Sequence, residues 1–116
     1  MKTTTKLFAI VALFATVLFA SCKKEETANP VASFTISPND TVSYNEILTL
    51  TNTSTNADSY VWNFGDGATS TATSPTKLYD DVAGLDCEET FTITLTATKD
   101  GKTSSTSKNV VVYFCL

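Results

Sequence analysis

Near the middle of the chain stands Trp62-Asn63-Phe64-Gly65-Asp66-Gly67, the most informative stretch of its 116 residues. Trp62 and Phe64 lie two positions apart, so in an extended segment both side chains point to one face, which we expect to be the core. The two glycines allow a backbone turn that a Cβ atom would obstruct. The aspartate between them can accept hydrogen bonds from backbone amides of the turn. The stretch is therefore predicted to be structural, and neither a catalytic acid nor a calcium loop.

Alternation of apolar and polar residues, which is typical of strands with one buried face, recurs on both sides of this stretch. The clearest run is Phe91-Thr92-Ile93-Thr94-Leu95-Thr96-Ala97, with four apolar residues on one face and threonines on the other. Further alternating or fully apolar runs are 31–36, 47–51, 60–64 and 110–114. Turn signals rich in Pro, Gly, Asn and Asp separate the runs. Short strands at this spacing predict an all-β antiparallel sandwich.

The sequence Lys99-Asp100-Gly101-Lys102 predicts a tight hairpin, because Asp-Gly accepts the positive φ angles of such turns. A two-residue loop makes Cys87 face Phe114, one residue from Cys115. A three-residue loop that includes Lys102 places the two cysteines directly opposite each other, whereas one that starts at Lys99 moves them further apart. The turn thus brings the sulfurs close, and a disulfide between Cys87 and Cys115 is predicted. The alternative is two free thiols in a frayed end.

The stretch at 62–67 resembles the Trp-Asp-Phe-Gly-Asp-Gly signature of the polycystic kidney disease (PKD) domain, an immunoglobulin-like sandwich. Supporting segments lie at 32–34, 50–54, 90–97 and 109–112. The resemblance implies an Ig-like antiparallel β-sandwich of about seven strands. It also implies an interaction module that binds proteins or polysaccharides.

Three features depart from the family pattern. Asn63 replaces the usual aspartate, which leaves the turn feasible but removes a charge. The segment 78–89 is longer than in a typical member. Cys87 and Cys115 are not part of the signature, so the longer segment, braced by a disulfide, is interpreted as a specialisation of this protein.

The first 22 residues have the features of an export signal. Residues 1–21 combine a basic start, an apolar run at 7–20 and small residues before Cys22. Residues 18–22 resemble a bacterial lipobox, which implies cleavage before Cys22 and acylation of that cysteine. The apolar run of 14 residues is shorter than the roughly 20 that span a bilayer, so membrane attachment is predicted through acyl chains on Cys22. The alternative is an ordinary signal peptide followed by a chance cysteine.

The predicted organisation is a lipoprotein signal peptide at 1–21, a lipidated tether at 22–30 and one sandwich domain at 31–116. Apart from proline, residues 23–30 of the tether contain no apolar residue larger than alanine. Its Lys23-Lys24-Glu25-Glu26 resembles the signals that send some Gram-negative lipoproteins to the outer face of the outer membrane. The predicted location is therefore the outer membrane, on the cell surface, with its periplasmic face as the alternative.

Charge and composition exclude several functions. Without residues 1–21 the chain has six lysines against twelve carboxylates, a net charge of −6, and it contains no arginine or histidine. Nucleic-acid binding is not expected, because affinity for phosphates needs clustered Lys and Arg. The lack of histidine removes Ser-His-Asp and Cys-His catalysis and imidazole metal ligation. The chain is predicted to be no enzyme and to hold no metal and no cofactor.

Two weaker motifs are present in the chain. Five carboxylates in or beside the longer segment carry oxygens that calcium prefers: Asp80, Asp81, Asp86, Glu88 and Glu89. Their spacing matches no calcium loop, so a solvated acidic patch is the preferred interpretation. Asp40-Thr41-Val42 resembles a short bacterial acceptor motif for O-glycosylation at Thr41, which is too short to be specific.

The remaining candidates for ligand contact are the four tyrosines, Tyr44, Tyr60, Tyr79 and Tyr113, whose rings suit stacking on a sugar. Core or rim positions are the alternative for most of them. Together these features predict a lipid-anchored module of the cell envelope that mediates protein or polysaccharide binding and adhesion. One alternative is a periplasmic structural or assembly partner that docks by a sheet edge. The other is an enzyme that would depend on Asp80 and Asp81.

Overall fold

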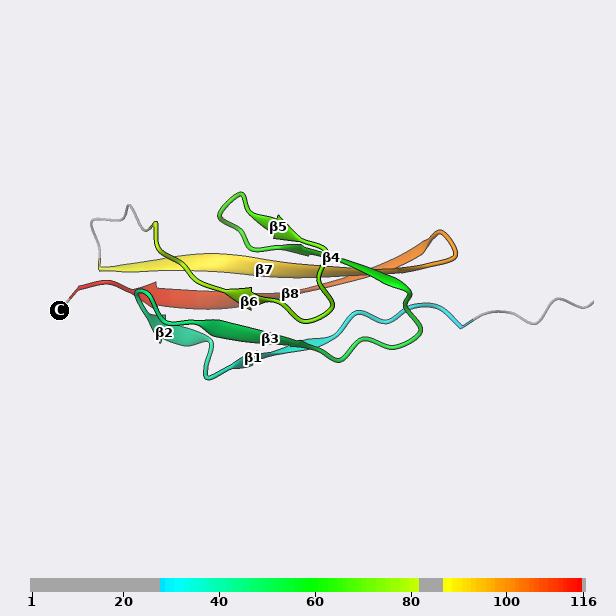
Figure 1. Ribbon diagram of the computed structural model, residues 1–116, viewed down its shortest axis with the longest axis horizontal. Helices are drawn as coiled ribbons and strands as arrows, with labels where there is room; N and C mark the ends of the chain where they lie inside the picture. The colour runs from blue at the N-terminus through cyan, green and yellow to red at the C-terminus, as the bar shows by residue number, and fades with distance from the viewer. Residues whose placement is uncertain (1–27, 82–86, 116) are drawn as a thin grey trace, which may run out of the picture.

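The computed structural model describes residues 28–81 and 87–115. Eight strands in these residues form two sheets, one with the order β1-β3-β6 and one with the order β2-β8-β7-β4-β5 (Figure 1). The strands are β1 Phe34–Ser37, β2 Thr41–Ser43, β3 Leu48–Asn52, β4 Ser59–Asn63, β5 Thr69–Ser70, β6 Thr76–Lys77, β7 Glu88–Lys99 and β8 Lys102–Tyr113. Every pairing is antiparallel except that of β2 with β8. The all-β sandwich predicted from the sequence is confirmed, with one strand more than expected.

The core lies between the two sheets and follows the predicted alternation. On β7, Phe91, Ile93, Leu95 and Ala97 are at most 6% exposed, while the threonines between them face outward or are only partly covered. Trp62 on β4 is fully buried and meets Phe34 of the other sheet edge-on, with ring centroids 5.1 Å apart. Burial of each large apolar side chain stabilises the fold by about 1.5–3 kcal/mol.

The turn after β4 has the geometry expected from its residues. Gly65 has a φ of +78°, and a Cβ atom there would lie 2.7 Å from the carbonyl oxygen of Thr92 on β7. The Asn63 side-chain oxygen accepts a hydrogen bond from the Gly65 backbone amide at 2.9 Å. Asn63 thus accepts the same hydrogen bond that an aspartate at this position could accept. The Asp66 carboxylate accepts one from the Ala68 amide at 3.0 Å.

An ion pair that the sequence did not reveal ties this turn to the other sheet. Lys77 on β6 pairs with Asp66, and its ammonium lies 5.1 Å from the ring centroid of Phe64 and 5.0 Å from that of Tyr79. Partial burial by itself raises the pKa of Asp66, but the hydrogen bonds and charge from Lys77 and the Ala68 amide outweigh it and lower that pKa. The Asp66–Lys77 pair therefore connects the two layers of the sandwich.

The pairing of β7 with β8 shows which of the predicted hairpin loops is present. Pairing runs from Glu88 opposite Tyr113 to Lys99 opposite Lys102, which is the two-residue loop at Asp100-Gly101. Cys87 nevertheless forms a disulfide with Cys115, with their Cα atoms 4.8 Å apart. The one-residue offset is absorbed beyond the ladder, where Cys87 has a φ of +67° and its carbonyl accepts a hydrogen bond from the Phe114 amide. The predicted disulfide is present.

Strand β8 starts earlier than its apolar run suggested. Residues 102–109 are polar, yet they pair with β7 along their whole length. Their side chains are exposed or only partly covered, so these residues show no apolar alternation. The short strands β2, β5 and β6 also lacked a sequence signal.

Several predictions concern residues outside those described. They include the signal peptide, the lipidation site Cys22, most of the tether and the carboxylate Asp86. Within the residues that the structure describes, no helix is long and apolar enough to cross a membrane.

Candidate binding site

The four candidate tyrosines differ in exposure, and Tyr79 is buried in the core. Tyr79 is 3% exposed, stacks on Phe91 with centroids 4.2 Å apart, and donates a hydrogen bond of 2.7 Å to the Phe64 carbonyl. Burial raises the pKa of its phenol well above the usual value, and the nearby charge of Asp66 adds to the effect. The prediction that Tyr79 contacts a ligand was wrong, because its ring fills the core.

Tyr60 lies on the inner face of β4, where it packs against the core with part of its side chain exposed. It pairs with Ala97, nine residues along β7 from Glu88, the partner of Tyr113. At about 3.3 Å per residue, roughly 30 Å separates these two positions. Tyr60 and Tyr113 therefore cannot contribute to one small site.

Tyr44 and Tyr113 come together at the opposite end of the molecule, where β8 ends. The parallel pairing of β2 with β8 sets Ser43 beside Tyr113, and the Tyr44 amide donates a hydrogen bond of 2.7 Å to the Tyr113 carbonyl. Their side chains are 41% and 46% exposed. The two tyrosines line a hollow of about 290 Å³ together with Ser43, Phe114 and Cys115. We refer to this hollow as the tyrosine site.

Polar contacts fix both rings of the tyrosine site. The Tyr44 hydroxyl donates a hydrogen bond of 3.0 Å to the carbonyl of Asp80. The Tyr113 hydroxyl donates a hydrogen bond to the Glu88 carboxylate, and this bond together with the negative charge of the carboxylate raises the pKa of the Tyr113 phenol. After β2 the chain turns back through Asn45, which has a φ of +64°, and the Glu46 carboxylate accepts a hydrogen bond from the Ser43 amide. The rings are thus held before any ligand arrives, which lowers the entropy cost of binding.

The disulfide forms one wall of the tyrosine site. Cys115 lines the hollow directly, and its bond to Cys87 anchors the two residues that follow β8 to the start of β7. The cross-link therefore keeps Phe114 and Cys115 in place at the hollow.

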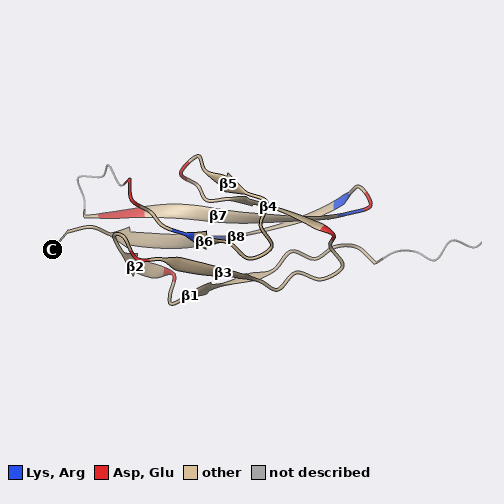
Figure 2. Ribbon diagram, viewed as in Figure 1, with Lys and Arg blue, Asp and Glu red and all other residues tan. Residues whose placement is uncertain are grey.

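Charge is unevenly distributed along the molecule. Figure 2 shows carboxylates at the end where β7 begins, close to the tyrosine site, and two lysines with one aspartate at the tip of the β7–β8 hairpin. Among the described residues, no three or more Asp, Glu, Cys or His side chains gather as a metal site would require. The chemistry available at the tyrosine site is therefore aromatic stacking, hydroxyl hydrogen bonding and acceptance by carboxylate and carbonyl oxygens. These groups suit a ligand rich in hydroxyl groups with apolar faces.

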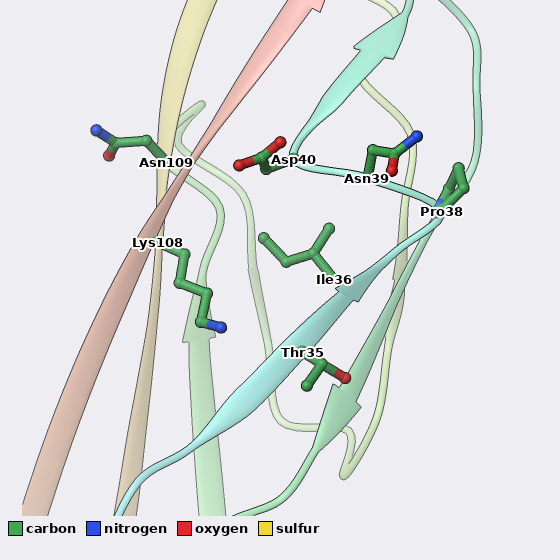
Figure 3. Close-up of a pocket in the computed structure, with 7 residues that line it drawn as sticks. All are labelled: Thr35, Ile36, Pro38, Asn39, Asp40, Lys108 and Asn109. Carbon is green, nitrogen blue, oxygen red and sulfur yellow. The ribbon is translucent and has the colours of Figure 1, made fainter.

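A second hollow lies between β1 and β8 and has a volume of about 550 Å³ (Figure 3). It is lined by Thr35, Ile36, Pro38, Asn39, Asp40, Lys108 and Asn109. We call it the edge groove. Sequence reasoning missed it; the one available signal was Lys108, a charged residue at a position of β8 that alternates with the inward-facing Val110 and Val112.

The two stacked sheets, antiparallel except where β2 pairs with β8, and with β1 and β2 in different layers, define an immunoglobulin-like β-sandwich. The family model of the PKD domain matches residues 27–113, and the chain belongs to that family. PKD domains are generally non-catalytic binding or structural domains. No curated protein matches the chain.

Solved structures support the same assignment. A structure described as carbohydrate-binding modules from the β-sandwich superfamily is 28% identical, with a TM-score of 0.66; the match covers 78% of this chain and 37% of that one. The PKD1 domain of Vibrio anguillarum Epp is 26% identical, with a TM-score of 0.59, and 78% and 100% of the two chains are covered. The PKD1 domain of the Vibrio cholerae metalloprotease PrtV is 28% identical, with a TM-score of 0.57 and coverage of 74% and 99%. This chain thus spans little more than a third of the first structure and nearly all of the other two.

Proposed function

We propose that this protein is a lipid-anchored, non-catalytic binding module of the cell envelope that holds a polysaccharide at the tyrosine site. The observation that carries the proposal is the pairing of Tyr44 and Tyr113. Two half-exposed aromatic rings from segments far apart in the sequence line one hollow and are fixed by hydrogen bonds and a disulfide. Exposed rings placed in this way are typical of ligand contact.

The family assignment supports a binding role in general, and the likeness to carbohydrate-binding modules supports the polysaccharide in particular. The site also suits sugars on physical grounds. Each ring can cover the apolar face of a pyranose. The carboxylate of Glu88 can accept hydrogen bonds from sugar hydroxyls, and the hydroxyl of Ser43 can donate or accept them. The acidic end of the domain favours a neutral polysaccharide over an anionic one.

The binding test is affinity measurement on an array of defined neutral polysaccharides, with the wild-type chain and the variants Tyr44→Ala and Tyr113→Ala. Stacking contributes about 0.5–1.5 kcal/mol per ring, so each variant should bind from twofold to about tenfold more weakly. Val61→Ala is the matched control, because Val61 is 49% exposed on β4 and lies outside the hollow. Unchanged affinity in both tyrosine variants would remove the site from the proposal.

The proposed anchoring depends on Cys22 and on the tether that follows it. Attachment through several acyl chains is expected to be stable, since a single chain holds only marginally. Replacement of Cys22 by Ala should move the protein from the membrane fraction to the soluble fraction. Protease treatment of intact cells, with a periplasmic lipoprotein as control, then tests the proposed surface location. Digestion only after lysis would place the domain on the periplasmic face.

A further inference from the structure

Strand β8 carries a stretch of unpaired sheet edge. On one side β7 covers it along its whole length, from Lys102 to Tyr113. On the other side β2 pairs with it only at Val111, Val112 and Tyr113. The part of β8 before Val111 is therefore an edge strand. Edge strands present backbone donors and acceptors that can pair with another chain.

The hydrogen-bonding pattern identifies which backbone groups face this edge. The Val111 amide donates to the Asp40 carbonyl, so it points away from β7. Because amides alternate in direction along a strand, those of Ser105, Ser107 and Asn109 point the same way. All three residues are exposed. Within the described residues, none of these three amides has a hydrogen-bond partner.

The edge is open because the chain changes sheets beside it. Thr41 pairs with Val111 in parallel; if this register continued toward the N-terminus, residues 35–39 would lie beside residues 105–109. Instead β1 pairs with β3, with Ile36 opposite Leu50. The chain returns to β8 only after the cis Ser37–Pro38 peptide bond. At the other end the gap closes where the Ala32 amide meets the Ser104 hydroxyl at 3.1 Å.

The edge groove lies alongside this unpaired edge. Figure 3 shows Ile36 on β1 and Lys108 on β8 facing the space between the two strands, with Asp40 at the end where β2 begins. The gap of five residues, 105–109, corresponds to about 16 Å of extended chain. Its length and its lining by two strands suit an extended peptide that adds to β8.

Lys108 gives the groove a charge preference. Its ammonium lies over the ring of Phe34, 5.4 Å from the centroid, in a cation–π contact, and the residue as a whole is exposed. Among the described residues, Lys77 forms a salt bridge with Asp66, but Lys108 forms none. An entering strand with an aspartate or glutamate at the inward position beside Lys108 would supply one.

We propose that the edge groove binds an extended peptide segment with an acidic side chain, which pairs with β8 through Ser105, Ser107 and Asn109 and places its carboxylate at Lys108. This is a protein-binding function, separate from the tyrosine site. Main-chain pairing provides the affinity and the acidic side chain the selectivity. The competing interpretation is that Lys108 is an inward-pointing charge that protects the edge from pairing. It predicts that the groove stays empty.

The test uses amide hydrogen exchange by NMR on the full chain, with two capped probe peptides, TVTETVT and TVTKTVT, at millimolar concentration. The glutamate peptide should slow exchange at Ser105, Ser107 and Asn109 at least tenfold. The amide of Thr106, which faces β7, serves as an internal control that should not change. The lysine peptide should have little effect.

Two variants make the test specific. Lys108→Glu should weaken binding of TVTETVT at least tenfold and make TVTKTVT the preferred peptide. Ser107→Pro removes an edge-facing amide without removing a bond to β7, and it should abolish binding of both peptides. Tyr44→Ala should have no effect, which separates this proposal from the polysaccharide site. Unchanged exchange with the glutamate peptide, equal binding of both peptides, or protection of the three amides in the free protein would each overturn the proposal.

Discussion

Substitution of Gly65 by alanine should destabilise this protein far more than the same change at Gly67. Both glycines lie in one turn and have positive φ angles, +78° and +91°. A side chain at such angles costs about 1–2 kcal/mol, offset in part by the smaller entropy of the unfolded alanine chain. That cost applies equally to both positions, so it cannot distinguish them.

The difference arises from what a Cβ atom would meet. At Gly65 it would lie 2.7 Å from the oxygen and 2.9 Å from the nitrogen of Thr92, both backbone atoms, whereas at Gly67 no atom lies within 4 Å. Thr92 is in the middle of β7 and cannot move aside without disturbing the pairing with Asn109 on β8. Overpacking of this kind costs about 1–3 kcal/mol. We expect a total of about 2–4 kcal/mol for Gly65→Ala and about 1 kcal/mol for Gly67→Ala.

Urea unfolding followed by tryptophan fluorescence measures both values. Trp62 is the single tryptophan, it is fully buried, and it lies three residues before Gly65. At about 4–8 °C per kcal/mol, the melting temperature should fall by about 8–32 °C for Gly65→Ala and by about 4–8 °C for Gly67→Ala. Equal losses in the two variants would show that close approach to Thr92 is not what requires glycine at position 65.

Three further predictions follow from the contacts described. Asp66→Asn should lower the free energy of unfolding by about 1 kcal/mol near pH 7. Because the pKa of Asp66 in the folded protein lies below the unfolded value of 3.8, the difference between the variant and the wild type should vanish as the pH falls through the folded pKa. Urea titrations at a series of pH values measure this difference. Reduction of the Cys87–Cys115 disulfide, whose ends are 28 positions apart in the sequence, should lower the free energy of unfolding by up to about 3.5 kcal/mol, whereas reductant should not affect the double Ser variant. Tyr79→Phe should lower the free energy of unfolding by about 1–2 kcal/mol, because it leaves the buried Phe64 carbonyl without a hydrogen-bond partner. In ultraviolet titration of the wild type, the Tyr79 phenol should ionise at higher pH than the exposed tyrosines. Ionisation together with them would contradict its burial.

Most features of the β7–β8 hairpin could be predicted from the sequence, but the length of its loop could not. Asp100-Gly101 and the alternation from Phe91 to Ala97 are local signals, and they led to the observed strand, core face and disulfide partner. The loop length stayed open, because loops of two and three residues both brought the cysteines near each other. Only the ladder itself, with Lys99 opposite Lys102, selected the shorter loop.

The candidate site was predicted less well, because exposure depends on how the sheets pack. Four tyrosines looked equivalent in sequence, yet Tyr79 is in the core, Tyr60 lies on an inner face, and Tyr44 and Tyr113 share a hollow. The edge groove had no signal beyond Lys108. Both sites depend on strand β2, whose three residues are too short to show alternation.

By itself, the sequence determined the class of fold and its central turn. Alternation, glycine in the turn and aromatic pairs act over a few residues, so their consequences are visible in the chain. The tertiary structure alone decided which surfaces are available for binding. The change of sheet between β1 and β2 unites Tyr44 with Tyr113 and leaves the edge of β8 open between Ser105 and Asn109. That change is a pairing choice between segments about seventy residues apart, and pairing partners at this distance are selected by packing of the whole core rather than by local sequence.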